Sequence, residues 1–179
     1  MGSKDVFMSL LEQAERRFGT RSRKLRIKVN GREEDIPETL ADGPDACVVY
    51  YYRKVKHNTQ RLRFQLAHEA IHVLSGVFRR DALKFEEGLA TWFSLDIFRK
   101  DPSYYDKAQA SIPPLFKDAL ELFEQLKPTD ETITTLRARC SCLDKVSPDL
   151  LKEVFDASDK LANKLCERFP LDMHLRRSP

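Results

Sequence analysis

"RFQLAHEAIHVL", residues 63–74, contains two histidines four positions apart and a glutamate directly after the first. Apolar residues recur at helical spacing around this motif, an asparagine precedes it and a glycine follows it, so we predict an α-helix over residues 60–75. Positions i and i+4 share one face of a helix, so His68 and His72 can direct two imidazole nitrogens at one point. The stretch therefore predicts a metal-binding helix.

A third protein ligand is expected, because a catalytic zinc site combines three protein ligands with a water molecule. The helix predicted at 82–100 carries two adjacent carboxylates near its start, Glu86 and Glu87. Neighbouring helical residues point about 100° apart, so only one of the two can face the metal. We prefer Glu87, because Ala90 and Thr91 on its side of the helix are small enough to let the two helices approach. Glu86 is the alternative ligand.

Glu69 is the predicted general base. It lies one position around the helix from His68, so its carboxylate can stand beside a water on the metal instead of binding the metal itself. Zinc lowers the pKa of such a water toward about 7, and a nearby carboxylate can take the proton and later pass it to the leaving amine of an amide. Two imidazoles and a carboxylate suit Zn²⁺ best, although they would also accept manganese, iron or cobalt.

The remaining sequence predicts an α+β fold, in which a small β-sheet packs on the metal-binding helix and the second ligand helix. An amphipathic helix at 5–17 precedes strands at 24–29 and 46–55, and Asn30-Gly31 is a strong turn signal after the first strand. Further helices are expected at 113–126, 130–139 and 147–169.

A chain of 179 residues can bury one good core but hardly two independent ones. We therefore expect a metal-site core at residues 1–100 and a helical extension at 101–179 that packs on it.

Basic residues cluster at 16–28 and 53–63, in runs of the kind that can bind phosphate backbones. Because the formal net charge is only +3, we expect these runs to form a solvated face, and nucleic acid is not the expected partner. Cys140 and Cys142 in "RCSC" have the form of half a metal site. No second cysteine or histidine pair has zinc-finger spacing, so ordinary reduced thiols are expected.

The N-terminal sequence "MGSKDVFMSL" lacks the apolar segment and the small-residue cleavage site of a secretory signal. No apolar run is long enough to span a bilayer. The four cysteines are too few and too irregularly spaced for a disulfide framework. We therefore expect a cytoplasmic protein without membrane association.

Two motifs resemble the ImmA/IrrE-like metallopeptidases. "RLRFQLAHEAIH" at 61–72 is similar to the family's R-x-R-F-T-L-A-H-E-L-G-H segment, and "EGLATWFS" at 87–94 is similar to its E-x-x-A-N-x-F-A segment. The second alignment independently puts Glu87 in the ligand position. The resemblance covers about residues 45–100.

This chain departs from the family pattern without losing a ligand or the base. The departures are Ala70-Ile71 for Leu-Gly, Thr91 for Asn and Ser94 for Ala. "EEGLA" is also similar to the N-E-G-F-A element of zinc aminopeptidases. The broader resemblance is therefore to zincins of the gluzincin type.

The resemblance implies a zincin-like α+β core and cytoplasmic proteolysis of a protein partner, often a helix-turn-helix repressor or an antitoxin-like protein. We predict a zinc-dependent endopeptidase with His68, His72 and Glu87 as metal ligands and Glu69 as base. The alternative is a zinc-binding regulatory protein that binds a protein or nucleic-acid partner without cleaving it.

Peptide binding and oxyanion stabilisation complete the predicted site. The strand at 46–55 precedes the metal-binding helix, and as an edge strand it would bind an extended peptide by main-chain pairing. A phenol or imidazolium near the metal could stabilise the oxyanion. Five residues are candidates for that role, although packing or a surface position is the simpler explanation for each: Tyr50, Tyr51, Tyr52, His57 and His174.

Overall fold

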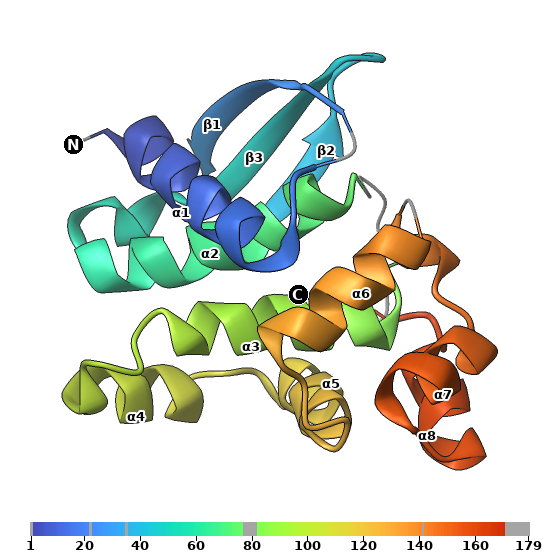
Figure 1. The fold of residues 1–179 in the computed structure, drawn as a ribbon. Helices are drawn as coiled ribbons and strands as arrows, with labels where there is room; N and C mark the ends of the chain where they lie inside the picture. Colours follow the sequence, from blue (N-terminus) through green and yellow to red (C-terminus); the bar gives the residue numbers. More distant parts are fainter. Residues whose placement is uncertain (1, 22, 35, 77–81, 141, 171–179) are drawn as a thin grey trace.

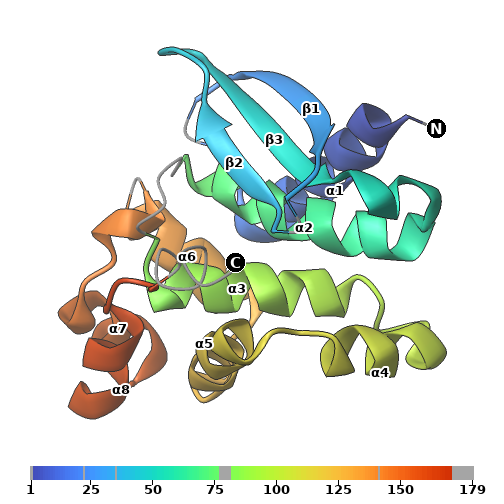
Figure 2. The ribbon, with the colours of Figure 1, turned by 180° about the vertical axis from the view of Figure 1, so that it is seen from behind.

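The computed structural model describes residues 2–21, 23–34, 36–76, 82–140 and 142–170. It confirms the α+β class, with a three-stranded sheet packed against helices (Figure 1). Helix α2 (Thr59–Ser75) lies between the sheet on one side and α3 (Lys84–Asp96) on the other. Figure 2 shows the same layers from behind. In the described part of the chain, no helix is long and apolar enough to cross a membrane.

The sheet has the strand order β1-β3-β2. β1 (Arg26–Arg32) pairs with β3 (Ala46–Tyr52) in parallel, and β2 (Glu38–Ala41) pairs with β3 from the other side in antiparallel orientation. The prediction that the strand at 46–55 is an edge strand is therefore wrong. β3 is the central strand, it ends at Tyr52, and a short 3-10 helix, η1 (Arg53–His57), follows it.

The turn predicted at Asn30-Gly31 is also wrong. β1 continues through both residues, which pair with Tyr50 and Tyr51 of β3. A Cβ on Gly31 would lie 3.2 Å from the Tyr51 ring, so glycine fits here by allowing the ring to approach. Its pairing with a distant strand, which a local turn signal does not reveal, keeps the segment extended.

The helix predicted at 60–75 is confirmed as α2. The Asn58 side chain accepts a hydrogen bond from the Arg61 backbone N–H at its start, and Gly76 adopts the left-handed conformation at its end (φ 72°). The first predicted helix is α1 (Ser3–Phe18), which packs on α2 through buried apolar residues. Both helices therefore contribute to one core, which also contains Ile27, Cys47 and Val49 of the sheet.

Helix α3 ends at Asp96, earlier than the predicted residue 100. It packs closely on α5 (Pro114–Glu124), and Gly88 lies at the contact. A Cβ on Gly88 would lie 2.6 Å from the Ala119 carbonyl oxygen and 2.6 Å from the Phe123 Cβ. The glycine that interrupts the helical sequence pattern therefore allows α5 to approach α3.

The C-terminal part is helical, as expected. The helices at 113–126 and 130–139 are confirmed, but 147–169 is two helices, because Asp156 adopts the left-handed conformation (φ 53°) between them. A helix at 102–110 was not predicted. These elements are α4 (Pro102–Ala110), α5, α6 (Asp130–Arg139), η2 (Leu143–Lys145), α7 (Pro148–Phe155) and α8 (Asp159–Leu165).

The largest buried cluster draws on both halves of the chain. Leu11 and Leu66 belong to it together with Phe123 and Leu151. The division at residue 100 stays a prediction.

Candidate metal centre

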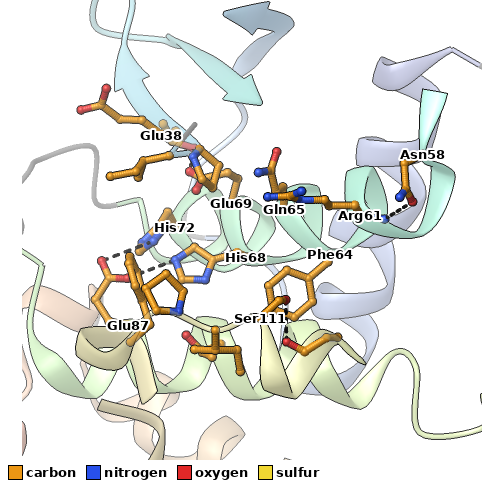
Figure 3. A pocket seen from close by; sticks show the side chains of 18 of the residues that line it. Glu38, Asn58, Arg61, Phe64, Gln65, His68, Glu69, His72, Glu87 and Ser111 are labelled. Atoms are coloured by element: carbon orange, nitrogen blue, oxygen red, sulfur yellow. Dashed lines mark hydrogen bonds and ion pairs between the residues drawn. The ribbon is translucent and has the colours of Figure 1, made fainter. Parts of the chain in front are cut away.

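Helices α2 and α3 bring His68, His72 and Glu87 together in a group that could hold a metal ion (Figure 3). These three residues form the candidate metal-binding group. The His68 Nε2 lies 3.1 Å from Glu87 Oε2, and the His72 Nε2 lies 3.6 Å from Glu87 Oε1. One donor atom from each residue lies within 4.8 Å of the others. The two histidines converge because they are one helical turn apart, and Glu87 reaches them from the first turn of the facing helix.

The donor set fits a divalent metal ion. Two imidazole nitrogens and a carboxylate are the ligands of a common catalytic zinc site. His68 is 7% exposed and Glu87 is 6% exposed, so the polar groups are withdrawn from bulk water but still reach a pocket. Among the described residues, this is the one group of three or more histidine, cysteine or acidic residues arranged to hold a metal ion.

Glu86 points to the other side of His72. Its Oε1 lies 2.9 Å from the His72 Nδ1, and its side chain is fully buried. It does not belong to the converging group, so the structure favours Glu87 over Glu86 as the candidate ligand. When Nδ1 carries a proton, it donates a hydrogen bond to Glu86. The lone pair of His72 Nε2 then points toward Glu87 and the pocket, where it can bind a metal ion. Glu86, predicted only as the alternative ligand, instead contacts and orients His72, a role that no sequence signal indicates.

Truncation of Glu86 is expected to weaken metal binding. The Glu86→Ala variant removes the acceptor that orients His72, and loss of such a partner typically lowers metal affinity about 10- to 100-fold. Glu86→Gln retains an acceptor oxygen and should have a smaller effect. Titration of zinc against a chromophoric chelator measures the affinities, with circular dichroism to verify folding. Glu131→Ala, exposed on α6, is the control, and an unchanged affinity in Glu86→Ala would contradict the orienting role.

Glu69 lies beside the candidate ligands, also buried, at 1% exposure. Burial raises the pKa of its carboxyl group, and the neighbouring imidazoles and the Thr39 hydroxyl partly oppose that shift. The Thr39 hydroxyl of β2 donates a 2.7 Å hydrogen bond to Glu69 Oε2. The carboxylate is therefore held in place by the sheet, next to the metal-binding group and without belonging to it.

A pocket of about 480 Å³ opens over this group. One face of α2 forms one wall, and residues 36–39 at the start of β2 form another. The remaining wall is largely apolar and comes from α4, α5 and the segment between them, where Ile112 and Phe116 lie. The Phe116 ring packs edge-on against His68, with 5.5 Å between ring centroids. The site therefore has room for an extended ligand beside the metal-binding group.

The candidate oxyanion residues do not line this pocket in the described structure. Tyr51 is buried in the main core, where its hydroxyl accepts a 3.0 Å hydrogen bond from Ser3. Tyr50 lies under the guanidinium of Arg32. Tyr52 and His57 also lie outside the pocket lining, and His174 is outside the described residues.

The two predicted thiols are not part of the metal-binding group. The Cys140 thiol donates to the Leu136 carbonyl oxygen, and the Cys142 thiol donates to the Ser75 carbonyl oxygen. Burial raises the pKa of Cys142 to about 11, with a further contribution from Asp144. Both are reduced, hydrogen-bonded cysteines at the ends of helices.

Several residues of the basic stretches form ion pairs with nearby carboxylates. Lys28 contacts Asp42 at 2.8 Å, Arg21 contacts Glu15 at 3.1 Å, and Arg53 contacts Glu33 at 2.9 Å. Partnered in this way, these cations present less positive charge than the sequence runs suggest.

Metal binding is expected to release a proton from His72. Burial opposes protonation of this imidazole, but the charge of Glu87 and the hydrogen bond to Glu86 raise its pKa to about 10. Below that pH the metal-free site is protonated, and a metal ion at Nε2 must displace the proton. Zinc affinity should therefore rise with pH, by up to about tenfold per unit between about pH 7 and 9. Calorimetry in buffers of different ionisation enthalpy measures the released protons, and an affinity independent of pH would contradict the protonated state.

Comparison of the chain with models of known protein families, with curated protein sequences and with solved structures gives no match. The indications of function are therefore the two sequence motifs and the geometry of this site.

Proposed function

We propose that this chain is a zinc-dependent endopeptidase of the ImmA/IrrE-like, gluzincin kind, with His68, His72 and Glu87 as zinc ligands and Glu69 as general base. The observation that carries the proposal is the convergence of the three ligand residues within 4.8 Å at the wall of a large pocket. Three protein ligands leave a coordination position for water or substrate, as in catalytic zinc sites. The proposed site therefore has both a metal-binding group and space for a substrate.

A zinc ion held by these residues would act as a Lewis acid toward a peptide carbonyl and would lower the pKa of a water molecule. Glu69 Oε2 is held by Thr39, which leaves Oε1 as the oxygen that takes a proton from water. The water oxygen then adds to the carbonyl carbon, the C–N bond breaks, and Glu69 returns the proton to the leaving nitrogen. Burial makes Glu69 a stronger base than an exposed carboxylate.

The β2 strand supports a peptide as the ligand. It is an edge strand, because β3 pairs with only one of its sides in the described sheet. Its first residues and the two before them line the pocket above Glu69. An extended peptide can add to such an edge through main-chain hydrogen bonds. The role that sequence analysis assigned to the strand at 46–55 therefore passes to β2.

The compartment and the partner follow from the motif resemblance. Proteolysis in the cytoplasm, of a helix-turn-helix repressor or an antitoxin-like protein, is the activity that the resemblance suggests. The pocket is consistent with any unfolded or extended protein segment.

Cleavage of a peptide mixture tests the proposal directly. The zinc-loaded protein is incubated with a large set of synthetic peptides, and mass spectrometry identifies new termini. We expect cleavage at internal bonds, its loss after treatment with 1,10-phenanthroline, and its return when zinc is added. Stoichiometric zinc without cleavage of any peptide would favour the zinc-binding regulatory alternative.

A further inference from the structure

The pocket extends along α2, away from the metal-binding group. His72 and His68 lie toward one end of it, and Arg61 and Asn58 lie at the other end (Figure 3). Positions 61, 65, 68 and 72 recur at intervals of three and four, so they occupy one face of the helix. A ligand that lies along this face contacts the metal-binding group first and Arg61 last.

Helix α4 supplies a second cation to the same pocket. Its residues Tyr104, Lys107 and Ala108 line the pocket, and they lie on one face at helical spacing. The Gln60 amide donates a 3.1 Å hydrogen bond to Asp101, which ties the start of α2 to the start of α4. Tyr104 lies close enough to Arg61 for the guanidinium charge to offset part of the rise that burial causes in the Tyr104 pKa. Lys107 therefore lies about one helical turn after Tyr104, the neighbour of Arg61.

These two cations differ from the ion-paired basic residues of the fold. Arg17, Lys28 and Arg32 form ion pairs with carboxylates. In the described ranges, neither Arg61 nor Lys107 forms an ion pair with a carboxylate, and both are exposed in the pocket wall. Two cations without a fixed counter-charge in a concave surface attract an anionic group of a ligand.

The spacing of Arg61 and His68 along α2 sets the position of the anionic group in the ligand. Arg61 precedes His68 by seven residues, which is about 10 Å along a helix at about 1.5 Å per residue. An extended peptide advances about 3.3 Å per residue, so about three residues span this interval. The lengths of the Arg61 and Lys107 side chains broaden the range to about two to four residues.

We propose that the Arg61–Lys107 end of the pocket binds a carboxylate of the peptide substrate, two to four residues from the bond that is cleaved. Because the position is counted from the cleaved bond, the inference rests on the proposed function. The carboxylate belongs either to an acidic side chain or to the C-terminus of the peptide, since both present the same charged group. Between this end and the metal-binding group, the substrate passes the apolar wall formed by Phe64, Ile112 and Phe116.

Matched peptides test the inference. Ten-residue fluorogenic peptides carry a central Phe-Leu pair and a single Glu at each position up to four residues on either side, and each has a Gln counterpart. A further pair ends three residues after Phe, with a free or an amidated C-terminus. For the zinc-loaded wild type we expect a three- to tenfold higher kcat/KM for Glu over Gln at one or two positions on one side. A preference confined to the free C-terminus would identify that carboxylate as the source.

The Arg61→Gln/Lys107→Gln double variant should lose this preference, so that each Glu peptide and its Gln counterpart have the same kcat/KM. The control, Arg63→Gln/Lys100→Gln, makes the same change in charge on α2 and after α3, outside the pocket lining, and should keep the preference. Equal cleavage of Glu and Gln peptides by the wild type, or a preference that survives in the double variant, would overturn the inference and leave proteolysis intact.

If the wild type cleaves none of the peptides, the proposed function fails, and binding still tests the carboxylate site. Fluorescein-labelled Glu and Gln peptides then report Kd by fluorescence anisotropy. Tighter binding of one Glu peptide, lost in the double variant, would support an anion-binding end of the pocket. Equal affinities would reject it.

Discussion

The Glu69→Gln variant is expected to retain its zinc and to lose peptide hydrolysis by a factor of about 10²–10⁴, the usual contribution of a general base. Glutamine has nearly the same shape, and its amide oxygen can still accept the hydrogen bond that Thr39 donates over 2.7 Å in the wild type. It cannot take a proton from water. The decisive measurements are kcat/KM with a peptide from the cleavage mixture and the zinc content of the same preparation.

Two outcomes of this experiment would contradict the assignment. Unchanged hydrolysis with bound zinc would show that Glu69 is not the base. Loss of zinc would show that Glu69 acts as a ligand, although it lies outside the converging group. Glu131→Gln, exposed on α6, is the matched control and should behave as the wild type.

The His72→Ala variant is expected to lose zinc. Structural zinc sites with four ligands bind with about 10–16 kcal/mol, so one ligand contributes about 3 kcal/mol, or at least a hundredfold in affinity. The substitution also removes the hydrogen-bond partner of the buried Glu86, which is 2.9 Å from His72 Nδ1 in the wild type. Some loss of folding stability should therefore accompany the loss of metal. Elemental analysis after removal of loosely held metal measures the stoichiometry.

His68→Ala helps to separate these two effects, because it removes a ligand and leaves the Glu86–His72 contact in place. Glu87 loses its 3.1 Å contact with His68 but still has His72 Nε2 at 3.6 Å. The His68→Ala variant should lose zinc with a smaller fall in melting temperature than His72→Ala. His57→Ala, at an exposed residue of η1, controls for the removal of a histidine outside the site. One zinc per chain in both ligand variants would reject the metal centre, and with it the proposed peptidase.

The features that were predicted correctly from sequence are local. The extent of α2, its capping residues and the shared face of His68 and His72 follow from backbone geometry within one helix. The amphipathic helices α1, α5 and α6 follow from the same periodicity. A helix fixes the relative directions of its own side chains, so this half of the site could be predicted without a partner element.

The choice between Glu86 and Glu87 is only partly local. The sequence shows that one of two adjacent carboxylates can face the metal. Which one does so depends on the rotation of α3 against α2, and that depends on packing with α5 at Gly88. In the fold, Glu87 faces both histidines and Glu86 holds the outer nitrogen of His72. The pair of glutamates thus has two roles that sequence reasoning treated as alternatives.

The sequence by itself therefore determined a helix that places two histidines on one face, where they can bind a metal ion with a third ligand, and a glutamate beside them. Tertiary packing alone decided what surrounds them. β2, which holds Glu69 through Thr39, is a four-residue strand, too short for a periodic signal. Asn30-Gly31, which favours a turn locally, is held in β1 by pairing with β3. Helix α4 brings Lys107 to the pocket. Such contacts join residues far apart in the chain, and their free energy comes from packing that local propensity does not contain.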